Sequence, residues 1–161
     1  MFRIQAEYDG QIEVGVTLAR VREFLDDARN FVELMPGIES ITAAAEGVRR
    51  WLIRADVPIL GAMRATFAVR QTEDAPERVE WSPVADERKN LLRYAATLEP
   101  RGPGRTLIRI TQRVEMRREK ASELHTLAVW IGEKRISTEM QRRIGEMMQT
   151  FLERARTKLE G

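Results

Sequence analysis

The sequence contains no cysteine and a single histidine, His125. The absence of cysteine excludes disulfide bonds, thiolate nucleophiles and cysteine-based metal sites. One histidine cannot supply a metal site with several histidine ligands, so we expect neither a metal nor a cofactor. His125 is the default candidate for a general base, because only histidine has an unperturbed pKa near neutrality. It lies among charged residues with no carboxylate at a spacing that orients it, so we assign no catalytic residue.

Long apolar runs are also missing. No run approaches the roughly 18 residues that are needed to cross a bilayer. The N-terminus alternates between apolar and polar residues and then turns polar, unlike a signal peptide with its apolar middle. These two absences predict a cytoplasmic protein.

An excess of charge of one sign is lacking as well. The chain has 27 basic and 25 acidic residues, a net charge of +2. The basic residues are spread along the chain and form no cluster with interleaved aromatic residues. We therefore predict no nucleic-acid partner.

What is present is a globular composition, with 43% hydrophobic and 32% charged residues among 161. A chain of this length can bury a core without disulfides or metals. We expect one domain over residues 1–161.

Seven segments alternate between apolar and polar residues, which is typical of half-buried strands. The first covers residues 2–15, where Asp9-Gly10 predicts a bend or a bulge. Turn-like residues separate the six segments that follow, and such short connections predict an antiparallel meander. These six segments are residues 38–45, 48–57, 63–72, 77–83, 91–99 and 105–116.

Two short helices are predicted between the first and second strands. Thr17 is a suitable N-cap for the first helix. Asp27 ends the first helix or caps the second, which covers residues 28–34 and stops where Pro36-Gly37 turns the chain.

The C-terminal stretch, residues 122–159, has helical periodicity in two phases. Gly132 lies where the phase changes, so we predict a short helix or a bend ahead of a long helix. The long helix carries an apolar stripe that must cover an apolar surface, and the strands provide that surface. The stripe consists of Ile136, Met140, Ile144, Met147, Met148, Phe151 and Ala155.

These elements predict an α+β helix-grip fold. A seven-stranded curved antiparallel sheet wraps around a long C-terminal helix, and two short helices follow the first strand. The passages Phe-Leu-Asp-Asp-Ala-Arg-Asn (residues 24–30) and Leu-Met-Pro-Gly-Ile-Glu (residues 34–39) resemble the Bet v 1/START-like (SRPBCC) superfamily. Within it, the branch of polyketide cyclase/dehydrase-like proteins and the branch related to the G-type accessory protein of carbon monoxide dehydrogenase look closest. The resemblance implies a hydrophobic ligand, such as a lipid, sterol, polyketide or quinone, between the sheet and the long helix.

Ten inward-facing residues form the predicted ligand-binding set. They either line a cavity or fill a solid core, because both are built from the same residue types. The set is Trp51, Phe67, Trp81, Tyr94, Ile110, Gln112, Met140, Ile144, Met147 and Phe151.

Three functions remain open from the sequence. The first is binding or transport of a hydrophobic small molecule or lipid in that cavity. The second is an enzyme of the polyketide cyclase/aromatase type, in which Tyr94, Gln112 or an inward arginine, Arg93 or Arg109, polarises a carbonyl. The third is a ligand-free partner-binding scaffold with a filled core and an exposed apolar patch.

The apolar turn at residues 58–63 is a further hypothesis. Ile59, Leu60 and Met63 are apolar although they lie in a turn with Gly61. We expect this turn to gate the mouth of the cavity or to touch a membrane transiently. The sequence leaves the oligomeric state open.

Overall fold

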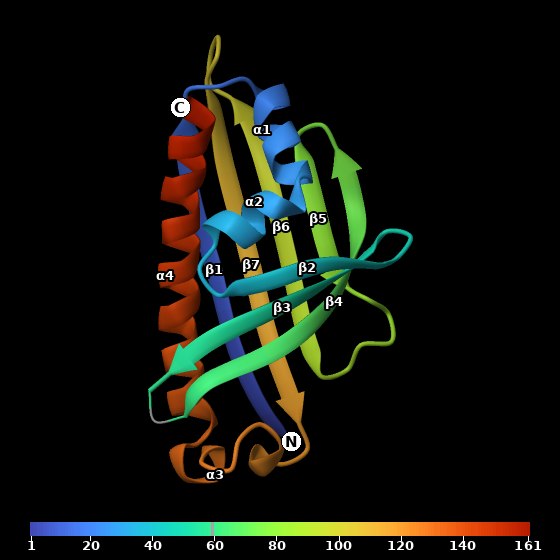
Figure 1. Ribbon diagram of the computed structural model, residues 1–161, viewed down its shortest axis with the longest axis vertical. Coiled ribbons are helices and arrows are strands. Elements are labelled where there is room, and N and C mark those ends of the chain that lie inside the picture. Colours follow the sequence, from blue (N-terminus) through green and yellow to red (C-terminus); the bar gives the residue numbers. More distant parts are fainter. Residues whose placement is uncertain (59) are drawn as a thin grey trace.

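Seven strands form one curved antiparallel sheet in the computed structural model, which describes residues 1–58 and 60–161. The strand order is β1-β7-β6-β5-β4-β3-β2, so β2 to β7 form the predicted meander and β1 returns beside β7. Figure 1 shows β2, β3 and β4 crossing steeply in front of the other strands, so that the sheet curls around its contents. The strands are β1 (Phe2–Val14), β2 (Ile38–Ala45), β3 (Val48–Val57), β4 (Gly61–Ala75), β5 (Arg78–Pro83), β6 (Asn90–Pro100) and β7 (Thr106–Arg118).

The helices lie where the periodicity placed them. Helices α1 (Leu18–Asp26) and α2 (Ala28–Leu34) follow β1. A 3₁₀ turn (Ala121–Glu123) and α3 (Ala128–Ile131) precede the long helix α4 (Glu133–Glu160). The predicted α+β helix-grip fold is confirmed.

The pairing of β1 with β7 corrects one prediction. Their register is unbroken along the whole strand and passes through Gly10 opposite Ile110, so the bend or bulge predicted at Asp9-Gly10 is wrong. Gly10 has a different role, because the ring of Tyr8 folds over it. A Cβ atom at Gly10 would lie 2.1 Å from the Tyr8 hydroxyl oxygen.

The two short helices begin at side-chain caps. The Thr17 hydroxyl accepts a hydrogen bond from the Arg20 amide at 3.3 Å. Asp27 serves both helices, since its amide donates to Phe24 at the end of α1 and its carboxylate accepts from the Arg29 amide at the start of α2. Such caps satisfy backbone groups that a helix end leaves unpaired.

Gly37 is the point where the chain leaves α2 for β2. It has φ of +90°, and a Cβ atom there would lie 2.6 Å from the Arg54 carbonyl oxygen and 2.9 Å from the Met147 methyl carbon. Only glycine fits both the conformation and the space. This close approach fixes the position of β2 and β3 relative to α4.

The break predicted at Gly132 is present. Gly132 has φ of +87° and separates α3 from α4. Beyond it, α4 buries the predicted stripe completely, together with Leu152 and Leu159.

Aromatic side chains occupy the middle of the core, between α2, α4 and the sheet. The ring of Phe31 stacks on Phe151 at 5.0 Å between centroids. It also contacts the rings of Trp51 at 5.4 Å and Tyr94 at 5.6 Å. Close-packed aromatic contacts of this kind leave little room for a ligand at the centre of the fold.

Helix α4 also closes the free edge of β1 (Figure 1). Side chains at every fourth position of α4 accept hydrogen bonds from amides at every second position of β1. The pairs are Arg3 with Glu133, Gln5 with Ser137 and Glu7 with Gln141, at N–O distances of 2.7, 3.2 and 2.8 Å. The spacings match because four helical residues rise about 6 Å and two strand residues about 6.8 Å.

Candidate ligand-binding site

An apolar gap lies between α4 and the sheet, at the end of the molecule where β3 stops and β4 begins. We call it the helix–sheet gap. It encloses about 20 Å³, which is room for roughly one water molecule. Its walls are Ile53, Ala55, Met63, Ala65, Phe67, Val114, Met116, Met140, Ile144 and Met147.

The walls of the helix–sheet gap are built from adaptable and small side chains. Four of the ten are methionines, at positions 63, 116, 140 and 147, and two are alanines, Ala55 and Ala65. Methionine has three rotatable bonds and a polarisable sulfur, so it repacks around irregular contents at low cost. The gap can therefore enlarge by rotation of side chains around a fixed backbone.

The structure divides the ten predicted site residues into two groups. Phe67, Met140, Ile144 and Met147 line the helix–sheet gap. The remaining six lie elsewhere in or around the core: Trp51, Trp81, Tyr94, Ile110, Gln112 and Phe151.

Six wall residues were absent from the predicted set, although the sequence carried a signal for them. Each of Ile53, Ala55, Met63, Ala65, Val114 and Met116 lies on the inward face of its strand. Strand alternation therefore identified them as inward. It did not show which stretch of that face stands away from α4.

Tyr94, Gln112 and Trp51 contribute buried polar atoms near the aromatic centre of the core. The Tyr94 hydroxyl oxygen, Gln112 Oε1 and Trp51 Nε1 have no hydrogen-bond partner among the described residues. Tyr94 and Gln112 face each other on adjacent strands, so two of these atoms belong to one cross-strand pair. Burial raises the pKa of the Tyr94 hydroxyl, with smaller effects from Arg22, which lowers it, and Asp26, which raises it.

Trp81 is half-buried and lies away from the gap. The guanidinium of Arg49 sits 4.6 Å from the centroid of its ring. This is the geometry of a cation–π contact. Its indole ring therefore meets a charged side chain rather than the walls of the gap.

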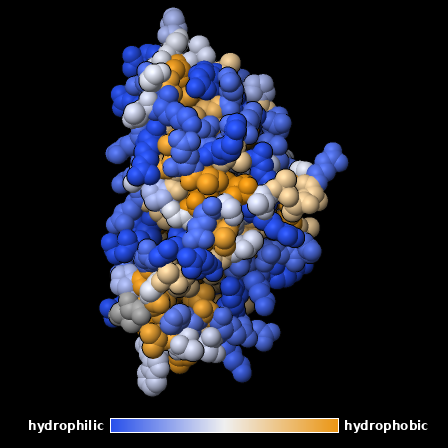
Figure 2. Space-filling model, in the orientation of Figure 1, coloured by the Kyte–Doolittle hydropathy of each residue, from blue (hydrophilic) through white to orange (hydrophobic). Residues whose placement is uncertain are grey.

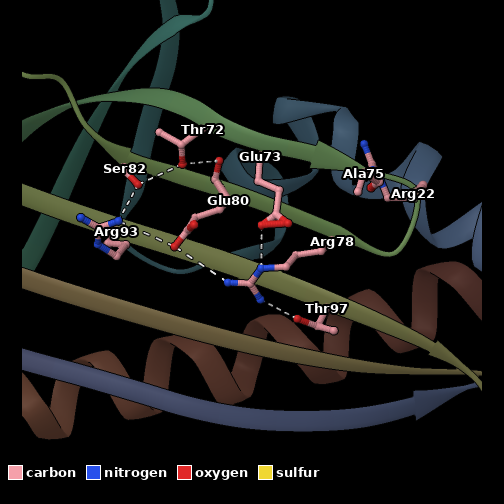
Figure 3. Close-up of polar contacts among 9 residues, drawn as sticks. All are labelled: Arg22, Thr72, Glu73, Ala75, Arg78, Glu80, Ser82, Arg93 and Thr97. Atoms are coloured by element: carbon pink, nitrogen blue, oxygen red, sulfur yellow. Dashed lines mark hydrogen bonds and ion pairs between the residues drawn. The ribbon is translucent and has the colours of Figure 1, made fainter.

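The arginines proposed to polarise a carbonyl face the wrong way. Arg109 is exposed, and Arg93 points to the outer face of the sheet, where it donates to the Ser82 hydroxyl at 2.7 Å. Figure 3 shows Arg93 and Arg78 within a network of outer-face side chains on β4, β5 and β6. Arg78 donates to Glu73 at 2.9 Å and to Thr97 at 2.8 Å. The prediction of an inward arginine at either position is wrong.

The turn at residues 58–63 differs from its expected exposure. Leu60 is buried, at 6% of its accessible surface, so it is not available as an exposed apolar contact. Met63 contributes to the wall of the gap. Ile59 lies outside the described residues.

His125 lies in the segment before α3. Its Nδ1 atom accepts a hydrogen bond from the Leu127 amide at 3.0 Å. No group of three or more metal-ligating side chains occurs within residues 1–58 and 60–161. In the same residues no helix is long and apolar enough to cross a membrane.

Comparison with solved structures identifies the fold. The Zhui aromatase/cyclase from Streptomyces has a TM-score of 0.64 and 14% identity, over 94% of this chain and 93% of that one. A START superfamily protein from Mycobacterium smegmatis also has a TM-score of 0.64 and 14% identity, over 96% and 97% of the two chains. This chain has the Bet v 1/START-like fold.

The START-like fold is shared with larger proteins as well. A di-domain aromatase/cyclase of the steffimycin biosynthetic pathway has a TM-score of 0.64 and 10% identity over 96% of this chain. The chain spans about half the length of this protein and of a second di-domain aromatase/cyclase, from the BE-7585A pathway. No protein-family model and no curated protein sequence matches the chain.

Proposed function

We propose that the chain binds an apolar small molecule or lipid in the helix–sheet gap, between α4 and strands β3, β4 and β7. The observation that carries this proposal is the composition of the gap, whose walls are entirely apolar and rich in methionine. A START-like fold with solved neighbours named as aromatase/cyclases supports it.

Binding requires the gap to open. Pockets for small molecules usually enclose about 300 Å³ or more, and this gap encloses about 20 Å³. Rotation of Met63, Met140 and Met147 is the least costly route, because it leaves the backbone in place. An apolar ligand would then replace contacts that the methionines make with one another.

The test uses a blocked gap and a matched control on the same hairpin. Ala55→Leu places a larger side chain inside the gap, whereas Ala62→Leu places the same one on an exposed position of β4. We expect Ala55→Leu to weaken binding of cis-parinaric acid by about tenfold or more, since the new side chain occupies the ligand's space. We expect Ala62→Leu to bind like the unaltered protein.

Fluorescence titration measures the affinity, and thermal unfolding shows that each variant is folded. If Ala55→Leu is too unstable to compare, Ala65→Leu blocks the same gap from β4. Equal affinity in the blocked and control variants would contradict the proposal.

A ligand-free partner-binding scaffold is the second candidate. Two observations favour it: the aromatic centre of the core is filled, and large hydrophobic side chains are exposed at one end of the molecule. Native mass spectrometry of the purified protein separates the two candidates. A co-purified apolar adduct that Ala55→Leu abolishes supports ligand binding, whereas a clean protein that also ignores added fatty acid supports the scaffold.

The enzyme alternative has less support from the geometry. A cyclase needs polar groups that converge on the ligand, and no polar side chain of the described residues lines the helix–sheet gap. The unpaired atoms of Tyr94 and Gln112 are the polar groups that a more widely opened pocket would reach.

A further inference from the structure

The exposed hydrophobic side chains of the molecule gather at one end. Among the described residues, the large hydrophobic side chains that are exposed are Met1, Leu127, Val129 and Trp130, at 74%, 41%, 57% and 86% of their accessible surface. Figure 1 places the N-terminus and α3 together at the same end of the molecule. In Figure 2 hydrophobic surface also reaches solvent at this end, among hydrophilic neighbours.

Leu127, Val129 and Trp130 form what we call the apolar tip. The segment that carries the tip is anchored rather than loose. Ala128 is completely buried, and Ile131 packs against the core from the same short helix. An anchored helix with an indole ring exposed to water holds that ring ready for a contact outside the chain.

Basic side chains surround the apolar tip. Lys120, Lys134 and Arg135 are exposed and form no ion pair among the described residues. Residues 117–135 contain five basic and three acidic residues, a net charge of +2. One of those acids, Glu133, already accepts a hydrogen bond from the Arg3 amide.

The helix–sheet gap lies at this same end of the molecule. Its walls include the last residues of β7, the first residues of β4 and the N-terminal half of α4. Helix α3 precedes α4 directly, separated only by Gly132. A surface that bound the apolar tip would therefore face the end of the fold where the gap opens.

We propose that the apolar tip and its basic rim dock the protein on an anionic lipid bilayer. Tryptophan favours the boundary between lipid head groups and acyl chains, where its ring is apolar and its N–H remains hydrated. Lysine and arginine beside such an anchor are attracted to anionic head groups. The docked end is the one through which an apolar ligand enters the helix–sheet gap.

A second copy of the chain fits this surface less well. A symmetric contact through the tip would bring Lys120, Lys134 and Arg135 of each copy close to the same residues of the other. Three neighbouring side chains also fall short of the roughly 800 Å² per partner that a stable interface buries. A bilayer accepts both the small apolar area and the positive charge.

Docking extends the proposed function by naming the source of the ligand, and it rests on that function only for its purpose. Vesicle binding is measured with no added ligand. Its failure would leave ligand binding in the gap untouched, and a failure of ligand binding would leave docking untouched.

The experiment is flotation with vesicles of phosphatidylcholine, with and without phosphatidylserine. We expect binding to the mixed vesicles that weakens as salt is added, because salt screens the basic rim. Trp130→Ser should lower the partition coefficient by about tenfold or more, since the apolar anchor is lost, whereas Trp130→Phe should retain most of the binding. Because Trp130 is exposed, neither substitution removes core packing.

The basic rim is tested separately. Lys134→Glu combined with Arg135→Glu should weaken binding to mixed vesicles by about tenfold or more. Arg101→Glu is the matched control, because Arg101 is exposed in the turn between β6 and β7, at the opposite end of the molecule. It should change binding much less than the rim variant does.

Three outcomes overturn the proposal. The first is an unaltered protein that does not float with phosphatidylserine vesicles. The second is binding that Trp130→Ser leaves intact. The third is a dimer in sedimentation that Trp130→Ser dissociates, which would assign the tip to a second copy of the chain.

Discussion

Tyr94 carries a hydroxyl group into the core, where no described residue hydrogen-bonds to it. Leaving such a group without a partner costs about 1–3 kcal/mol of folding free energy. The Tyr94 ring nevertheless packs against Phe31 and Trp51, so its apolar part is well used. The cost lies in the oxygen atom alone.

Tyr94→Phe should therefore stabilise the protein. It removes the unpaired hydroxyl and keeps the ring, so we expect the free energy of unfolding to rise by up to about 1 kcal/mol in urea titrations. Tyr8→Phe is the matched control, because Tyr8 lies at the edge of the core and is only partly buried. A marked loss of stability in Tyr94→Phe would reveal that the hydroxyl has a partner.

The same variant should change the response to alkali. Burial raises the pKa of Tyr94 above its ordinary value of 10.0. The folded state then holds this proton more tightly than the unfolded state does, so the contribution to stability is full below about pH 10 and is lost as the pH rises further. Tyr94→Phe should flatten this alkaline decline, measured as unfolding midpoints between about pH 9 and pH 11 at equal ionic strength.

Residue-level prediction from the sequence depended on strand alternation, and it succeeded where alternation was applied strictly. It placed Tyr94 and Gln112 inward, and both are buried. Applied to Arg93 and Arg109, the same rule assigns both to the outer face, because each is flanked by inward residues in its strand. The error there was chemical preference overriding geometry.

At the scale of elements, the contact of α4 with the edge of β1 is the arrangement least visible in the sequence. An edge strand exposes unpaired amides that invite another strand. Glu133, Ser137 and Gln141 cover three of them with side-chain oxygens. At the far end of the strand, the Glu160 carboxylate accepts from the Gly15 amide at 2.8 Å.

Gln141→Ala tests this contact. We expect a loss of about 0.5–1.5 kcal/mol in the free energy of unfolding, because the Glu7 amide loses its acceptor. Gln149→Ala is the control, since Gln149 is an exposed glutamine of the same helix with no side-chain hydrogen bond among the described residues. Amide exchange at Glu7 should accelerate in the first variant only, and equal exchange in both would contradict the role of Gln141.

Element boundaries followed from the sequence because the periodicity of each segment changes sharply at its turns. The ranges 38–45, 48–57 and 28–34 agree with β2, β3 and α2 to the residue. Asp9-Gly10 misled because glycine in a strand often marks a bulge, whereas here it makes room for the Tyr8 ring. The volume of the helix–sheet gap was out of reach, because it depends on the rotamers of methionines and not on which face they occupy.

At the scale of the whole molecule, carboxylates tie distant elements together and make stability depend on pH. The hydrogen bond from the Arg29 side chain, with the Arg29 amide, lowers the pKa of Asp27 to about 2. The Gly15 amide, with Arg156 and Arg105, lowers the pKa of Glu160. Both groups are charged more readily in the folded state than in the unfolded one.

Acid should therefore weaken the fold. Carboxylates with lowered pKa values contribute stability above their unfolded values, near 3.8 for Asp27 and 4.5 for Glu160. That contribution is lost as the pH falls towards about 2, because the unfolded state binds the protons first. Urea midpoints should decline between about pH 5 and pH 2, and Asp27→Asn should decline less than a control at the exposed Asp86, Asp86→Asn. A parallel decline in both variants would contradict the contribution of Asp27.

The seam between β1 and α4 also bears on how the chain is made. Synthesis delivers β1 first, yet the residues that complete its hydrogen bonds follow 130 to 145 positions later. At ribosomal rates that interval is on the order of ten seconds, during which the emerging N-terminal strand has neither neighbour. Maturation of this protein is thus tied to its last codons, and any nascent chain stalled before α4 would leave the ribosome with an open, adhesive border.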